Sequence, residues 1–108
     1  MICFILIEFA ITPLNIILLT QKMEVSIELT FSPLQDDFEP PIIQLITSLR
    51  NSGLHIKENP LSTQVYGNYD EVMNILQTEM KTALEAVEHG LLYMKIVKSN
   101  RQDYEPDF

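Results

Sequence analysis

Hydrophobic and polar residues alternate strictly between residues 24 and 31. A period of two predicts a β-strand with one apolar side and one polar side. The two sides carry Val25, Ile27, Leu29 and Phe31 on the one hand, and Glu24, Ser26, Glu28 and Thr30 on the other. Ser32 and Pro33 are expected to end this strand, and a loop should follow over residues 34–39.

A helical period follows this loop. Its apolar residues recur at three- and four-residue spacing and are Ile42, Ile43, Leu45, Ile46 and Leu49. Pro40 and Pro41 suit the first turn of a helix, where a missing N–H group costs no hydrogen bond. Asp36 and Asp37 are expected to cap this helix and complement its dipole, which is a more common use of adjacent loop carboxylates than catalysis. Gly53 lies just past the expected end.

A hairpin is expected next, with a short strand over residues 54–57, a turn at residues 58–60 and a second strand from Leu61 to Gly67. In the second strand Ser62, Gln64 and Tyr66 alternate with Thr63 and Val65. A strand that carries serine, glutamine and tyrosine on one face is not expected to have both faces in an apolar core. We therefore interpret this polar face as the floor of a binding surface.

A second helix is expected from residue 69 to residue 89. Asn68 followed by Glu71 resembles a capping box, with asparagine in place of serine or threonine. The apolar stripe of this helix contains Val72, Leu76, Met80, Ala83, Leu84 and Val87. Gly90 is expected to end the helix, residues 91–97 to form the last strand, and residues 99–108 to form a mobile acidic tail.

The expected order is strand, helix, strand, strand, helix, strand. Two right-handed crossovers around a hairpin give an α+β, ferredoxin-like fold over residues 23–98, with four antiparallel strands and both helices on one face. The strands at residues 24–31 and 61–67 should lie at the centre of the sheet. The open face is mixed in character, and another copy of the same sheet commonly covers such a face, so we expect a homo-oligomer. The residues expected on it are Ser26, Glu28, Thr30, His55, Lys57, Ser62, Gln64, Tyr66, Tyr93 and Lys95.

Composition narrows the classes of partner. The 108 residues are 46% hydrophobic and 20% charged, which suits one domain with a buried core. A net charge of −8 with only seven lysines and arginines argues against nucleic acid and is compatible with a cationic small molecule. Cys3 is the only cysteine, so one chain cannot form a disulfide, which fits a reducing, cytoplasmic compartment. Neither a metal site nor a cofactor site is indicated by the sequence.

Residues 1–22 differ sharply in composition from the rest and allow three interpretations. They could be an upstream extension of the reading frame, with translation starting at Met23. They could be a membrane anchor, although Glu8 and Pro13 interrupt the roughly 20 apolar residues that a span needs. They could also be an unusual signal segment, without a basic start or a typical cleavage site. Contact with a membrane is expected only if this segment is part of the protein.

Several segments resemble the YkoF-type thiamine-binding proteins. They are Met-Glu-Val-Ser-Ile-Glu-Leu at residues 23–29, Pro33-Leu34 followed by Asp36, Leu-Ser-Thr-Gln-Val-Tyr-Gly-Asn-Tyr-Asp-Glu-Val at residues 61–72, and Tyr93-Met94-Lys95-Ile96. The resemblance covers residues 23–98. It implies a ferredoxin-like domain that binds thiamine or its hydroxymethylpyrimidine part without transforming it, for carriage or sequestration of the vitamin. The founding members carry two tandem domains, so a dimer or tetramer should replace the tandem here.

Thiamine presents a cationic thiazolium ring and an aminopyrimidine with donor and acceptor edges. A receptor needs a carboxylate, amide or hydroxyl groups and an aromatic face. The open face offers each of these, and the candidate ligand-binding residues there are Ser26, Glu28, Ser62, Gln64, Tyr66 and Tyr93. Thr63 is a seventh candidate. It alternates to the helix side, where its hydroxyl is expected to bond to the backbone or to cap a helix end.

Two other functions stay open. Glu28 could pair with Lys95 across adjacent strands while the polar side chains line a wet interface, as in a structural or regulatory oligomerisation module. A small enzyme would need a base placed by burial, for which Glu28 is the one good candidate. We expect no catalytic activity.

Overall fold

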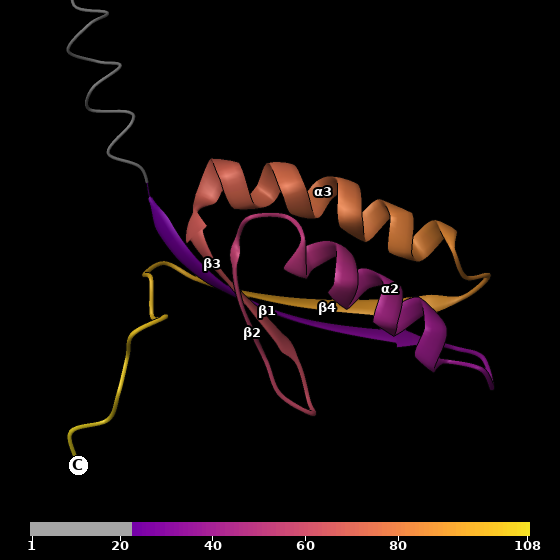
Figure 1. The fold of residues 1–108 in the computed structure, drawn as a ribbon, viewed down its shortest axis with the longest axis horizontal. Coiled ribbons are helices and arrows are strands. Elements are labelled where there is room, and N and C mark those ends of the chain that lie inside the picture. Colours follow the sequence, from indigo (N-terminus) through magenta and orange to yellow (C-terminus); the bar gives the residue numbers. More distant parts are fainter. Residues whose placement is uncertain (1–22) are drawn as a thin grey trace, which may run out of the picture.

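The computed structural model describes residues 23–108, so the expectations for residues 1–22 lie outside the described residues. The chain forms six elements in the expected order (Figure 1). They are β1 (Glu24–Pro33), α2 (Glu39–Arg50), β2 (His55–Glu58), β3 (Thr63–Asn68), α3 (Tyr69–Glu85) and β4 (Gly90–Val97). No helix within residues 23–108 combines the length and the apolar character that crossing a membrane requires.

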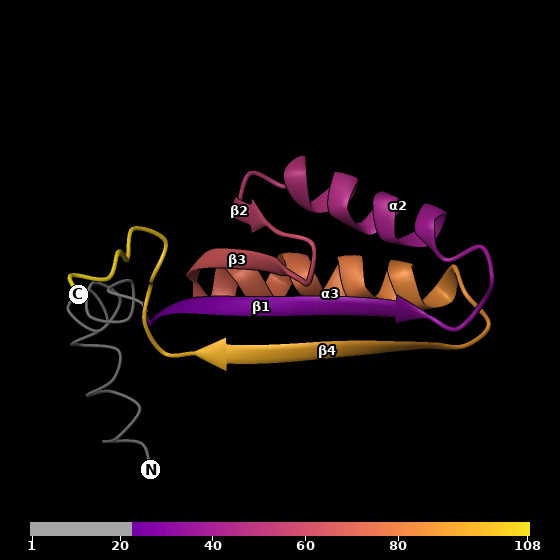
Figure 2. The same cartoon turned by 90° about the horizontal axis from the view of Figure 1, so that it is seen from below.

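The four strands form one antiparallel sheet with the order β2-β3-β1-β4. The fold is therefore α+β and ferredoxin-like, as the sequence predicts, with β1 and β3 at the centre. β1 and β4 run side by side over a long register that pairs Ser26 with Val97 and Pro33 with Gly90 (Figure 2). β1 thus continues two residues beyond its expected end, because Ser32 and Pro33 still have partners in β4.

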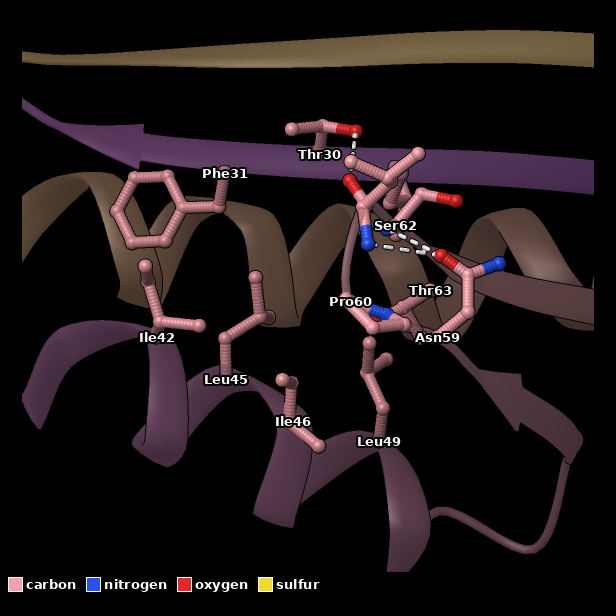
Figure 3. Close-up of a pocket in the computed structure, with 12 residues that line it drawn as sticks. Thr30, Phe31, Ile42, Leu45, Ile46, Leu49, Asn59, Pro60, Ser62 and Thr63 are labelled. Atoms are coloured by element: carbon pink, nitrogen blue, oxygen red, sulfur yellow. Dashed lines mark hydrogen bonds between the residues drawn. The ribbon is translucent and has the colours of Figure 1, made fainter. Parts of the chain in front are cut away.

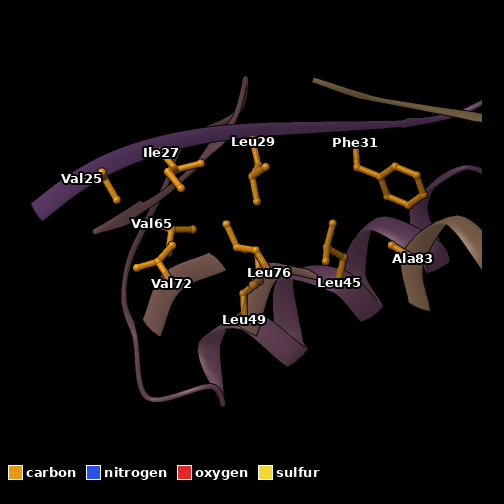
Figure 4. Close-up of a cluster of buried hydrophobic side chains, with 10 residues drawn as sticks. All are labelled: Val25, Ile27, Leu29, Phe31, Leu45, Leu49, Val65, Val72, Leu76 and Ala83. Atoms are coloured by element: carbon orange, nitrogen blue, oxygen red, sulfur yellow. The ribbon is translucent and has the colours of Figure 1, made fainter. Parts of the chain in front are cut away.

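The alternation in β1 decides where the core lies. Every second residue from Val25 to Phe31 is buried, and these side chains face both helices (Figure 4). Leu45 and Leu49 of α2 and Leu76 of α3 close the core from the other side. Both helices therefore cover the same face of the sheet, and the other face is open.

The two helices begin in different ways. The Oδ1 atom of Asn68 accepts hydrogen bonds from the backbone N–H groups of Asp70 (3.1 Å) and Glu71 (3.4 Å), so the predicted cap of α3 is confirmed. The prediction that Asp36 or Asp37 caps α2 is wrong. The residue before α2 is Phe38, which makes no side-chain cap, and prolines in the first turn leave fewer N–H groups to satisfy.

The end of α3 differs from the prediction. The helix stops at Glu85, four residues early, and Gly90 is the first residue of β4 instead of the helix terminator. The turn packs tightly against β1, since a Cβ atom on Gly90 would lie 3.1 Å from Val87 Cγ2 and 3.2 Å from Phe31 Cε1. The close approach of the returning chain to Phe31 explains the glycine at this position.

Candidate functional site

Three of the candidate residues are joined by hydrogen bonds on the open face. Gln64 Nε2 donates to Ser62 Oγ at 2.7 Å, and Ser62 Oγ donates to Glu28 Oε2 at 2.9 Å. Glu28 and Gln64 lie opposite each other in the β1–β3 register, which brings their side chains to the same place. The amide, the hydroxyl and the carboxylate therefore form one connected polar group.

The carboxylate of Glu28 also has a cationic neighbour. Lys95 lies opposite Glu28 in the β1–β4 register, and its Nζ atom is 3.8 Å from Glu28 Oε1. Both side chains are well exposed, at 45% for Glu28 and 71% for Lys95, so solvent weakens this ion pair. The ion pair that the oligomerisation hypothesis requires is thus present, and Glu28 is shared between a hydroxyl and an ammonium group.

Four of the seven candidates gather around one hollow of about 150 Å³, and they are Ser26, Glu28, Gln64 and Tyr66. Lys95 and Arg101 line the same hollow. One carboxylate thus faces two cationic side chains there, although the chain as a whole carries a charge of −8. The hollow therefore suits a neutral group better than a cationic one.

The contribution of the C-terminal segment is not evident from the sequence. The Ser26 hydroxyl donates to the Ser99 carbonyl at 2.7 Å and accepts from the Arg101 N–H at 2.8 Å. Lys57 Nζ donates to the carbonyl of Gln102. Residues 99–102 therefore contact the open face, and they use both hydrogen-bonding capacities of the Ser26 hydroxyl. No hydrophobic period or turn signal in the tail indicates this contact. The mobility of residues 99–108 stays a prediction.

The two candidate tyrosines lie at different places. Tyr66 pairs with Ser26 and borders the hollow, whereas Tyr93 pairs with Thr30. Four residues of β1 separate these positions, which is about 13 Å along a strand. Tyr66 is therefore the aromatic ring next to Glu28 and Gln64, and Tyr93 lies toward the far end of the face, 58% exposed.

The ring of Tyr66 already has neighbours on β2. His55 lies edge-on to it, with the ring centroids 5.7 Å apart, and Lys57 Nζ is 5.6 Å from the ring centroid. β2 is held to α2 because the Nε and Nη2 atoms of Arg50 donate to Glu58 at 2.7 and 2.6 Å. This hydrogen-bonded pair lowers the pKa of Glu58 and raises the pKa of Arg50.

Thr63 lies on the opposite face, as its place in the alternation predicts. Its side chain is 7% exposed and borders a separate pocket between the sheet and α2 (Figure 3). Within residues 23–108 no hydrogen bond to the Thr63 hydroxyl is present, so the expected bond to the backbone or a helix end is not formed there. The structure thus separates Thr63 from the other six candidates.

No protein-family model matches the chain. No curated protein sequence matches it either. Solved structures do: protein SP2199 from Streptococcus pneumoniae has a TM-score of 0.68 and 26% identity, covering 75% of this chain and 92% of that one. A candidate thiamine biosynthesis/salvage protein from Thermotoga maritima has a TM-score of 0.63 and 19% identity, covering 68% of this chain and 81% of that one.

A third similar structure is a domain of unknown function, DUF77, from Bacillus cereus, with a TM-score of 0.64 and 16% identity. It covers 81% of this chain and 86% of that chain. At such low identity, the likeness to the Thermotoga and Bacillus proteins shows a shared fold alone. Most of the length of each neighbour is matched, so the described domain corresponds to nearly the whole fold of these proteins.

Proposed function

We propose that this protein binds thiamine or its hydroxymethylpyrimidine part on the open sheet face, without converting it. The observation that supports the proposal most is the connected group formed by Gln64, Ser62 and Glu28 beside the ring of Tyr66. The resemblance of residues 23–98 to YkoF-type proteins and the description of the Thermotoga neighbour point to the same ligand class.

The geometry favours the hydroxymethylpyrimidine part as the group that enters the hollow. An aminopyrimidine is neutral and presents donors and acceptors, which an amide and a hydroxyl can meet. A cavity of about 150 Å³ holds one six-membered ring. The cationic thiazolium of thiamine would lie better outside the hollow, away from Lys95 and Arg101.

The proposal includes a second copy of the chain, which covers the bound ligand. The hollow is shallow, and small-molecule sites usually enclose most of the ligand surface. Leu91 and Tyr93 of β4 are 45% and 58% exposed and lie on the same open face, toward its far end from the hollow. A partner sheet that packs on this face would cover both the apolar side chains and the bound ring. The assembly is a dimer or tetramer in this proposal.

Calorimetric titration of the full chain with hydroxymethylpyrimidine and with thiamine tests the function. Binding should be lost or weakened about tenfold in Gln64→Ala, since one good hydrogen bond to the ligand disappears. Gln77→Ala is the matched control, because Gln77 is exposed on α3 and remote from the sheet face. Absence of heat with either compound at millimolar concentration would remove the proposal.

A second candidate function is a structural or regulatory oligomerisation module that binds only protein. The Glu28–Lys95 ion pair and the exposed apolar residues of β4 favour it. In this case Gln64→Ala would change the size of the assembly in light scattering. Neither vitamin compound would then raise the melting temperature.

A further inference from the structure

A pocket lies on the helix side of the sheet, between α2, β1 and the turn that leads into β3. It has a volume of about 190 Å³ (Figure 3). Ile42 and Leu45 of α2 form one wall, Leu29 and Phe31 of β1 form the floor, and residues 59–63 form the opposite wall. Of the connected polar group on the open face, Ser62 also borders this pocket, whereas Glu28 and Gln64 do not. The pocket is distinct from the hollow on the open face.

The wall made by residues 59–63 is held in place by hydrogen bonds. Asn59 Oδ1 accepts from the N–H groups of Leu61 at 2.8 Å and Ser62 at 2.9 Å, which is an Asx turn. The Asn59 N–H donates to the Ser62 carbonyl at 3.1 Å, and Thr30 Oγ1 donates to the Leu61 carbonyl at 3.3 Å. A wall fixed in this way needs little ordering when a ligand binds.

Thr63 gives the pocket one buried polar group. Its side chain is more than nine-tenths buried, and no residue that the structure describes bonds to its hydroxyl. Within residues 23–108 no fully buried side-chain polar atom lacks a hydrogen bond, so the Thr63 hydroxyl is accessible from the pocket. It can either donate a hydrogen bond to a ligand or accept one. A ligand that carries one polar group would satisfy it.

The rest of the lining limits the ligand. All the lining side chains are uncharged, and most are leucine, isoleucine, phenylalanine or proline. Burial of an ion among them would be costly, so the ligand should be neutral. A cavity of about 150 Å³ takes up benzene, and 190 Å³ leaves room for one ring with a small substituent.

We propose that this pocket is a second binding site, which takes up a small neutral aromatic molecule with one hydrogen-bonding substituent. The ring packs between α2 and β1, and the substituent bonds to the Thr63 hydroxyl. The two sites share Ser62 as a neighbour, but Thr63 and Gln64 point to opposite faces of β3, so each site can be tested by its own substitution.

Benzamide is a suitable probe, since it has one ring and one neutral amide. Titration of the ¹⁵N-labelled full chain should shift the amide signals of residues 59–63 and of α2, with a Kd of about 1 mM for so small a ligand. Thr63→Val keeps the shape and removes the hydroxyl, and it should weaken benzamide binding at least fivefold. Toluene, which lacks the polar group, should bind the native chain and Thr63→Val equally.

Three further variants complete the test. Thr78→Val makes the same substitution on the exposed surface of α3 and should leave benzamide binding unchanged, as should Gln64→Ala. Ile46→Phe at the pocket wall should abolish it. The proposal is overturned if 20 mM benzamide shifts no signal of residues 59–63, or if Thr63→Val binds benzamide as the native chain does. The vitamin site is tested with other ligands and with Gln64→Ala. A negative result for benzamide would therefore leave the proposed vitamin site untouched, and the reverse also holds.

Discussion

The two faces of the sheet carry opposite kinds of chemistry, although the same strand builds part of both. On the open face, Gln64 belongs to a polar group whose members bond to one another, and its carboxylate, Glu28, also pairs with Lys95. On the helix side, the hydroxyl of Thr63 borders a pocket with no charged side chain. No residue within 23–108 hydrogen-bonds to this hydroxyl. The comparison shows that the polar residues of the open face largely bond to one another, whereas the Thr63 hydroxyl has no hydrogen bond to any residue within 23–108. A face rich in polar groups can satisfy itself.

The largest expected effect is on the free energy of unfolding, which should depend far more on a side chain of the helix side than on one of the open face. Leu49 is fully buried and borders the pocket, so Leu49→Ala should lower the free energy of unfolding by about 2–5 kcal/mol. Glu28 is half-exposed, and Glu28→Ala should cost less than about 1 kcal/mol. Urea unfolding followed by circular dichroism measures both. Equal losses in the two variants would contradict the assignment of the core to the helix side.

A pair of substitutions sharpens the contrast between the binding properties of the two faces. Gln64→Ala should weaken hydroxymethylpyrimidine binding about tenfold and leave benzamide binding unchanged. Thr63→Val should do the reverse, because each side chain serves one face of β3. Calorimetry with both compounds on both variants gives the four values. Loss of hydroxymethylpyrimidine binding in Thr63→Val alone would place the vitamin ligand in the helix-side pocket instead.

The charge of the open face gives a smaller effect. Lys95→Gln removes a cation 3.8 Å from Glu28, so the carboxylate becomes more available to a cationic ring. Thiamine affinity should rise about threefold relative to that of neutral hydroxymethylpyrimidine, since this screened pair has a modest energy. Lys81→Gln, on the exposed surface of α3, is the matched control. An unchanged ratio of the two affinities would show that the thiazolium lies far from Glu28.

The smallest expected effect concerns pH at the β2 edge of the sheet, where Glu58 pairs with Arg50 of α2 on the helix side. Arg50 lowers the pKa of Glu58 in the folded state, so this pair stabilises the protein above the unfolded pKa of the carboxyl. That contribution is lost as the pH falls through the lower, folded pKa. Arg50→Gln should therefore be slightly less stable than the native chain near neutral pH. The two should converge in acid, as thermal unfolding at several pH values would show.

Much of the fold follows from local pattern. The alternation at residues 24–31 predicts which side chains of β1 are buried, and Asn68 caps α3 as expected. The periodicity is less reliable for single positions: Ile43 and Leu84 belong to the apolar stripes in the sequence but are 58% and 42% exposed. A stripe one residue too wide looks the same in a sequence, because only packing decides its edge.

The candidate site is less predictable than the fold. The face of the sheet on which a side chain lies follows from alternation along its own strand. The sequence therefore places Glu28, Gln64 and Tyr66 together on the open face correctly. The position of Tyr93 along that face depends on the β1–β4 register, which a period of two does not encode. The role of Arg101 beside Ser26 depends on how the chain returns after β4.

The sequence by itself determined the order of the elements, the apolar side of β1 and the opposite directions of Thr63 and Gln64, because side-chain alternation along a strand is a local property of the backbone. Only the tertiary structure decided that Lys95 lies beside Glu28, that residues 99–102 contact the open face, and that Thr63 borders a pocket. These contacts join residues far apart in the chain. They depend on register and on the path of the loops, to which no local pattern corresponds.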